Sequence, residues 1–239
     1  MSKPPRIDRK SLKNPDEFVT RGRAGLGFLV RHQKRFVPVL LGLGVVVVAT
    51  YGYDYWSKVQ MEKGWQSYNA AIKLPEDQRW EKLKTLHGEL KSGRPAFFAA
   101  VNLADHYFDE AKKGELKGAA EKSTSAVTSA EWYQRATVEP SLLPAEQQLL
   151  QINRGGALEI GKQWDDALSA YQKATDLGGD AKGLALLGVA RVHEAKGETP
   201  KAVETYEKVA TDFGANEYGK MAKNSLRRLK SPLFEAPKS

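Results

Sequence analysis

Histidines and carboxylates are the side chains of this sequence that could carry out acid–base or metal chemistry. His193-Glu194 begins like the His-Glu-x-x-His motif of zinc enzymes, in which two histidines one helical turn apart hold the metal. The position of the second histidine is Gly197, so the ligand pair is incomplete. The remaining histidines are far apart in the sequence: His32, His87 and His106. The chain also has no cysteine, no phosphate-binding loop and no nucleophile elbow. We therefore expect no catalytic residue, no metal and no cofactor, and a protein that is not an enzyme.

An uncharged run of 18 residues, 36–53, is the strongest single signal in the sequence (FVPVLLGLGVVVVATYGY). A helix of this length spans about 27 Å, close to the ~30 Å hydrocarbon core of a bilayer. A buried core helix is rarely apolar on every face, and a cleaved signal peptide would have a shorter apolar region followed by a small-residue cleavage site. The tyrosines and tryptophan at 51–56 are typical of a membrane interface. The run predicts one transmembrane helix.

Positive charge is concentrated before this run. Residues 1–35 contain ten Lys and Arg against three Asp and Glu, a net +7 out of the total +8, which leaves +1 for residues 36–239. The positive-inside rule then places residues 1–35 in the cytoplasm and the large C-terminal part on the other side of the membrane. We expect this basic tail to be disordered and to contact anionic lipid, as the apolar run contacts the lipid core. Nucleic-acid binding is not indicated, because the folded part is nearly neutral.

The rest of the chain has the spacing of apolar residues that is typical of helices, and no convincing strand pattern. Residues 54–92 predict a helical stalk or first hairpin, residues 93–230 a helical domain, and residues 231–239 a flexible tail. Within the helical domain, glycine and proline mark the helix ends, as at Gly178-Gly179, Gly197 and Pro200. The fold class is therefore all-α, a transmembrane helix followed by a helical domain.

Two segments of this domain repeat at a fixed offset of 35 residues: Ala167 matches Ala202, and Tyr171 matches Tyr206. Small residues at fixed points let antiparallel helices approach closely, and a large aromatic fills the gap that they leave. Upstream, Gly155 pairs with Ala190 in the preceding helix of each copy.

These positions resemble those of the tetratricopeptide repeat (TPR) family, a helix–turn–helix unit of about 34 residues. The Leu-Gly opening of the family's first helix is missing in the earlier copy, and its terminal proline is replaced by Gly179. A degenerate third copy is expected at 96–137 and a capping helix at 217–230, which together form a TPR-like solenoid. The resemblance implies that the first helix of each pair lines a concave, protein-binding face. The side chains that this assigns to the face are Phe98, Val101, Asp105, Leu149, Ile152, Glu159, Leu184, Leu187, Arg191 and Glu194.

The order of basic tail, single span, stalk and degenerate TPR domain also resembles the YfgM-type ancillary subunits of the bacterial Sec translocon. That resemblance implies an inner-membrane protein with a periplasmic domain, whose partners are translocon components, periplasmic chaperones or newly exported clients. The alternative is a structural or receptor subunit of another membrane apparatus: a secretion, cell-division or cell-wall complex, or an organelle import receptor with a cytosolic TPR domain. In each case we expect a protein–protein interaction platform.

Overall fold

The computed structural model describes residue 30 and residues 33–113 and 119–231. Within these residues there are nine helices and no strand, which confirms the all-α prediction. The helices are α2 (Gln33–Ile72), α3 (Glu76–Leu90), α4 (Arg94–Lys113), α5 (Ala119–Ala136), α6 (Pro144–Ile160), α7 (Trp164–Asp176), α8 (Lys182–Ala195), α9 (Thr199–Asp212) and α10 (Glu217–Leu229).

The chain divides into two units, residues 1–59 and residues 60–239. The first unit contains the apolar part of α2, and its valines are exposed, with Val45 at 69% and Val48 at 72%. Among the described helices, α2 alone is long and apolar enough to cross a membrane. The expected basic tail lies outside the described residues, except for Val30 and residues 33–35, which are helical. The expected C-terminal tail likewise lies outside them, except for Ser231.

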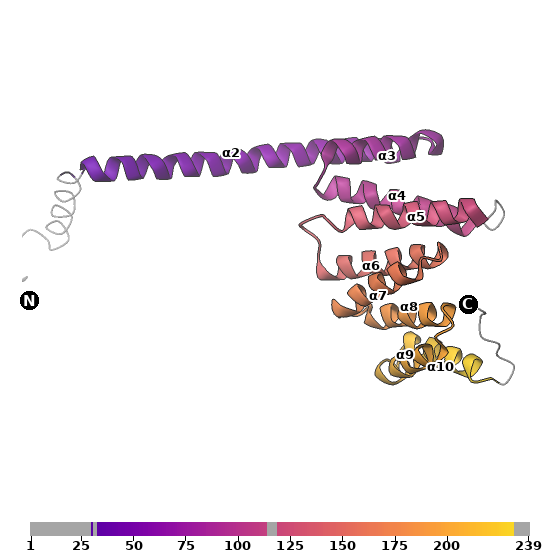
Figure 1. Ribbon diagram of the computed structural model, residues 1–239. Coiled ribbons are helices and arrows are strands. Elements are labelled where there is room, and N and C mark those ends of the chain that lie inside the picture. The colour runs from indigo at the N-terminus through magenta and orange to yellow at the C-terminus, as the bar shows by residue number, and fades with distance from the viewer. Residues whose placement is uncertain (1–29, 31–32, 114–118, 232–239) are drawn as a thin grey trace, which may run out of the picture. The chain divides into compact units, whose positions relative to one another are not determined.

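The second unit is a series of helical hairpins, α4/α5, α6/α7 and α8/α9, closed by α10 (Figure 1). From α3 onward, each helix packs against the next along the chain. The first helices of successive hairpins also contact one another, α4 with α6, α6 with α8, and α8 with α10. This pattern of nearest-neighbour packing is that of a helical solenoid, in which each repeat contacts mainly the next one.

Tyr171 of α7 explains why small residues occur at fixed positions in the helices that flank it. A Cβ atom added at Gly155 of α6 would lie 2.7 Å from the Tyr171 ring, and one added at Gly188 of α8 would lie 2.5 Å from it. The ring, 1% exposed, therefore fills a slot between two helices that only glycine leaves open. Tyr206 of α9, the repeat partner of Tyr171, is buried to the same extent.

The end of α7 is closed by a turn and a side chain from the neighbouring helix. Gly178 and Gly179 both have positive φ, 73° and 69°, a backbone conformation that glycine adopts without steric cost. The buried Gln148 of α6 donates from Nε2 to the carbonyl oxygen of Ala174 at 2.9 Å and to that of Gly178. The carbonyl of Ala174, in the last turn of α7, is thereby bonded without water.

Glu146 ties the start of α6 to the start of α4. Its Oε2 accepts a hydrogen bond from the backbone N–H of Leu143 at 2.9 Å, and its two oxygens accept from the Arg94 guanidinium at 2.7 and 3.1 Å. The bonds from Arg94, and then that from Leu143, hold the pKa of the Glu146 carboxyl below its ordinary value. A carboxyl whose pKa is lowered by folding stabilises the protein only while it is ionised.

Replacing Glu146 by glutamine is therefore expected to lower the free energy of unfolding by about 1 kcal/mol at pH 7, because the charge-assisted bonds from Arg94 are weakened. The stabilisation from Glu146 is complete above the ordinary carboxyl pKa of about 4.3 and is lost as the pH falls through the lower native value. The difference between wild type and Glu146→Gln should accordingly shrink below about pH 4. Thermal unfolding of both proteins, followed by circular dichroism from pH 7 to pH 3.5, measures it.

Glu89→Gln, at an exposed glutamate of α3, is the control for this series. If it shifts the unfolding curve with the same pH dependence as Glu146→Gln, the contribution does not come from the contact between Glu146 and Arg94.

Candidate functional site

The three described histidines lie apart from one another, each against a different neighbouring side chain. His106 stacks on Trp80 with ring centroids 3.9 Å apart, and its burial lowers the pKa of the imidazole. His87 lies edge-on to Trp132, and His193 Nδ1 lies 2.7 Å from Glu198 Oε2. Across the described ranges no three His, Asp or Glu side chains are grouped so that they could hold a metal ion. His32 lies outside those ranges.

Several charged residues predicted for the concave face form a ladder of internal bonds along the first helices. The Tyr171 hydroxyl donates to Glu159 at 2.8 Å, and Arg191 of the next hairpin donates to both oxygens of Glu159 at 2.9 Å. The pKa of the buried Tyr171 hydroxyl is raised, first by burial and then by the negative charge of Glu159.

The same arrangement recurs one hairpin later, and its tyrosine–carboxylate bond also recurs one hairpin earlier. Arg228 of α10 donates to both oxygens of Glu194 at 2.6 and 2.7 Å, and the Tyr206 hydroxyl lies 3.4 Å from Glu194. In the first hairpin the Tyr133 hydroxyl donates to Asp105, which raises the pKa of Tyr133 further after burial. Three of the four predicted charged residues, Glu159, Arg191 and Glu194, thus take part in contacts between successive units, whereas Asp105 bonds within its own hairpin.

The apolar residues predicted for the same face are mostly packed inside the domain. Ile152 and Leu187 are buried, at 7% and 2% exposed. Phe98, Val101 and Leu184 are partly buried against the main hydrophobic core. Leu149 is the exception, at 49% exposed. Binding of a partner by this residue set stays a prediction.

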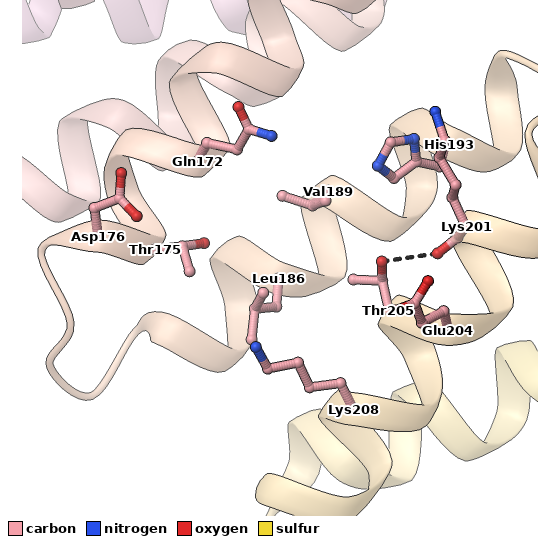
Figure 2. Close-up of a pocket in the computed structure, with 10 residues that line it drawn as sticks. All are labelled: Gln172, Thr175, Asp176, Leu186, Val189, His193, Lys201, Glu204, Thr205 and Lys208. Atoms are coloured by element: carbon pink, nitrogen blue, oxygen red, sulfur yellow. Dashed lines mark hydrogen bonds between the residues drawn. The ribbon is translucent and has the colours of Figure 1, made fainter.

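A hollow of about 280 Å³ on the predicted face is lined by Glu159, Arg191 and Glu194. Larger open grooves lie between successive second helices. The 7–9 groove, a hollow of about 350 Å³, has α7 and α9 as walls and α8 as floor. Figure 2 shows Leu186, Val189 and His193 on the floor, between side chains of the two walls. The Thr205 hydroxyl on one wall donates to the backbone oxygen of Lys201 at 2.8 Å. The wall residues are Gln172, Thr175, Asp176, Lys201, Glu204, Thr205 and Lys208.

The 5–7 groove is the equivalent feature one hairpin earlier, with α5 and α7 as walls and α6 as floor. It consists of a hollow of about 590 Å³ over Arg154 and Leu158, and one of about 430 Å³ over Gln147 and Gln151. Gln151, Arg154 and Leu158 precede Leu186, Val189 and His193 by the same 35 residues as separate the two repeats. The wall residues are Val127, Ala130, Glu131, Gln134, Arg135, Thr137, Gln163, Asp166, Lys173, Asp176 and Leu177.

Sequence reasoning assigned binding to the first helices and did not find these grooves. One signal for them was present, since Gln147, Gln151, Arg154 and Leu158 recur at four- and three-residue spacing and so share one face of α6. A face with three polar residues, next to the buried faces of the same helix, indicates a partly open surface.

The fold and these surfaces define a protein of stacked helical hairpins that carries one helix able to cross a membrane. Comparison with known proteins adds no narrower assignment, since no family model matches the chain and no curated protein matches its sequence significantly.

Proposed function

We propose that this chain is a single-pass membrane protein whose TPR-like domain is a platform for binding other proteins. One observation carries the proposal: successive hairpins leave equivalent grooves open, 35 residues apart, between their second helices. A solenoid offers extended surfaces of this kind because each repeat buries only the faces that meet its neighbours. The grooves have mixed polar and apolar linings, which suits polypeptide rather than a small apolar ligand.

The membrane placement in this proposal follows from the long exposed apolar helix and from the charge of the residues before it. With seven net positive charges in residues 1–35, the N-terminus lies in the cytoplasm and the domain lies outside it, as in a bacterial inner-membrane protein with a periplasmic domain. Translocon components, periplasmic chaperones and newly exported proteins are the partners that fit this location. A subunit of a secretion, cell-division or cell-wall complex is the second candidate, because the same surfaces would serve it. An organelle import receptor would instead have its TPR domain in the cytosol.

One experiment tests both orientation and binding. The chain has no cysteine, so a single introduced cysteine is a unique labelling site. The four positions are Gln134 in the 5–7 groove, Lys208 in the 7–9 groove, Glu89 on α3 and Ser11 in the N-terminal tail. Spheroplasts are treated with a membrane-impermeant benzophenone maleimide and illuminated, and crosslinked proteins are identified. We expect labelling at Gln134, Lys208 and Glu89 but not at Ser11, and specific crosslinks from the two groove positions only.

Labelling at Ser11, with the three domain positions protected, would contradict the proposed orientation. Crosslinks from Glu89 as strong as those from Gln134 and Lys208 would show that the grooves are not the binding surface. Recovery of only division or wall-synthesis proteins would favour the second candidate.

A further inference from the structure

The floor of the 5–7 groove contains buried polar atoms that lack partners. Three buried side-chain nitrogen or oxygen atoms have no hydrogen-bond partner in the described part of the chain, and two of them are Gln151 Oε1 and Arg154 Nε. A buried donor or acceptor that is left unpaired costs about 1–3 kcal/mol. Two such atoms three residues apart on one helix face are therefore a feature that packing alone does not favour.

The equivalent positions of the next hairpin show that helix packing does not require polar side chains here. Leu186 and Val189 occupy the equivalent positions of α8, where they are 6% and 7% exposed. The third floor position differs in the opposite way, since α6 has the apolar Leu158 where α8 has His193, which is bonded to Glu198. The hairpin α6/α7 thus has an amide and a guanidinium where its neighbour has two aliphatic side chains.

Gln151 Oε1 accepts a hydrogen bond and Arg154 Nε donates one, so the pair complements a backbone N–H and a backbone C=O. An extended chain presents both groups along one edge, at every second residue. The χ3 torsion of glutamine is soft and can turn Gln151 Oε1 toward the groove, whereas Arg154 Nε reaches it through a change between staggered rotamers of the arginine stem. From Gln147 to Leu158 the floor is about 16 Å long, which accommodates about five residues of extended chain.

The charges around the groove are of both signs, so they do not select a partner of one particular charge. Glu131 and Asp166 line the same hollow as Arg135 and Arg154, and Lys173 and Asp176 line the adjoining one. Because both signs are present in each hollow, a strongly acidic or strongly basic segment would meet repulsion as well as attraction. Recognition of the backbone, by contrast, is independent of the side chains of the bound segment.

We infer that the 5–7 groove binds an extended segment of unfolded polypeptide through its backbone, with Gln151 and Arg154 as the contacting residues. This inference rests on the proposed protein-binding function and names the state in which the partner is bound. It assigns no such role to the 7–9 groove, whose floor is mainly aliphatic.

The test uses the full chain in phosphatidylcholine nanodiscs and fluorescein-labelled, carboxamidomethylated α-lactalbumin, a permanently unfolded polypeptide, as the probe. The variant Gln151→Leu/Arg154→Val introduces the side chains of the equivalent α8 positions. We expect its affinity, measured by fluorescence anisotropy, to fall about tenfold, as for the loss of one or two buried hydrogen bonds. Its melting temperature should be equal to or higher than that of the wild type, because the unpaired polar atoms are removed.

The matched control is Gln172→Leu/Lys208→Met, which removes an amide and a cation from the walls of the 7–9 groove and should leave the affinity unchanged. Affinity of the floor variant within twofold of wild type would overturn the inference, and so would an equal loss in the control. If the double floor variant unfolds, Arg154→Met alone is measured against the same criteria. Failure of the wild type to bind the probe would also overturn the inference, whereas crosslinks from Gln134 or Lys208 in membranes would still support the proposed function.

Discussion

Replacing Gly188 by alanine is expected to lower the free energy of unfolding of the helical domain by about 3 kcal/mol, because a single methyl group overfills a closed slot. The added Cβ would lie 2.5 Å from the Tyr171 ring, closer than carbon atoms approach without displacement. The ring is closely packed on its other side as well, because a Cβ placed at Gly155 of α6 would lie only 2.7 Å from it. The Tyr171 hydroxyl is in addition bonded to Glu159 and Arg191, which fixes the ring along its own axis.

Thermal unfolding of the full chain measures this effect, and for a domain of this size 3 kcal/mol corresponds to a decrease in Tm of about 6–12 °C. Gly88→Ala is the matched control, because Gly88 is also in a helix but no atom lies within 4 Å of the position that its Cβ would take. That change should stabilise the protein by up to about 1 kcal/mol, through helix propensity alone. Combining Gly188→Ala with Tyr171→Leu should cost less than the sum of the two changes, since the smaller side chain relieves the overlap. Additive losses would contradict the account of the slot.

Replacing Arg191 by methionine is expected to lower the free energy of unfolding by about 2 kcal/mol. Glu159 then keeps the hydrogen bond from the Tyr171 hydroxyl but loses both bonds from the guanidinium. The Arg191 side chain is 41% exposed and that of Glu159 22%, so solvent screens the pair and the cost stays below that of a fully buried ion pair. Since Glu159 belongs to α6 and Arg191 to α8, the loss should fall on the contact between two hairpins. A double-mutant cycle with Glu159→Gln, read from urea unfolding, isolates the coupling.

Arg227→Met provides the control for this cycle, as it removes an exposed arginine of α10 for which no ion pair is seen among the described residues. Its effect should lie within about 0.5 kcal/mol of zero. A coupling between Arg191 and Glu159 no larger than the change produced by Arg227→Met would show that the ladder does not hold the hairpins together.

The two sides of the hairpin stack differ in how their side chains are bonded. On the side of the first helices, tyrosine, carboxylate and arginine residues bond to one another across successive hairpins. On the side of the second helices, the grooves have no comparable network across them, within the residues that the structure describes. Substitutions in the grooves can for this reason be made without breaking the bonds between hairpins.

Sequence alone predicted the helices closely. The capping helix expected at 217–230 begins at the same residue as α10, and the expected markers Gly178-Gly179, Gly197 and Pro200 lie at or next to helix ends. The reason is local: apolar spacing, proline at first-turn positions and glycine at helix ends act within a few residues. The buried small and aromatic residues of the repeat, Ala167, Tyr171, Ala202 and Tyr206, were likewise visible, because each must fit the helix next to it in the chain.

The candidate site could be predicted only in part. Helical phase placed Asp105, Glu159, Arg191 and Glu194 on related faces. The structure pairs the last three across successive units and bonds Asp105 to Tyr133 within its own hairpin. Sequence could not indicate that they bond to the protein itself, because Glu159 and Arg191 are 32 residues apart and their pairing depends on how two hairpins are stacked.

The sequence by itself thus determined the apolar run, the helices and the faces that each helix must bury, since those properties depend on near neighbours along the chain. Only the tertiary structure decided which charges are paired and which grooves stay open. These depend on the distances between helices, and those distances are set by close packing at points such as Gly155, Tyr171 and Gly188.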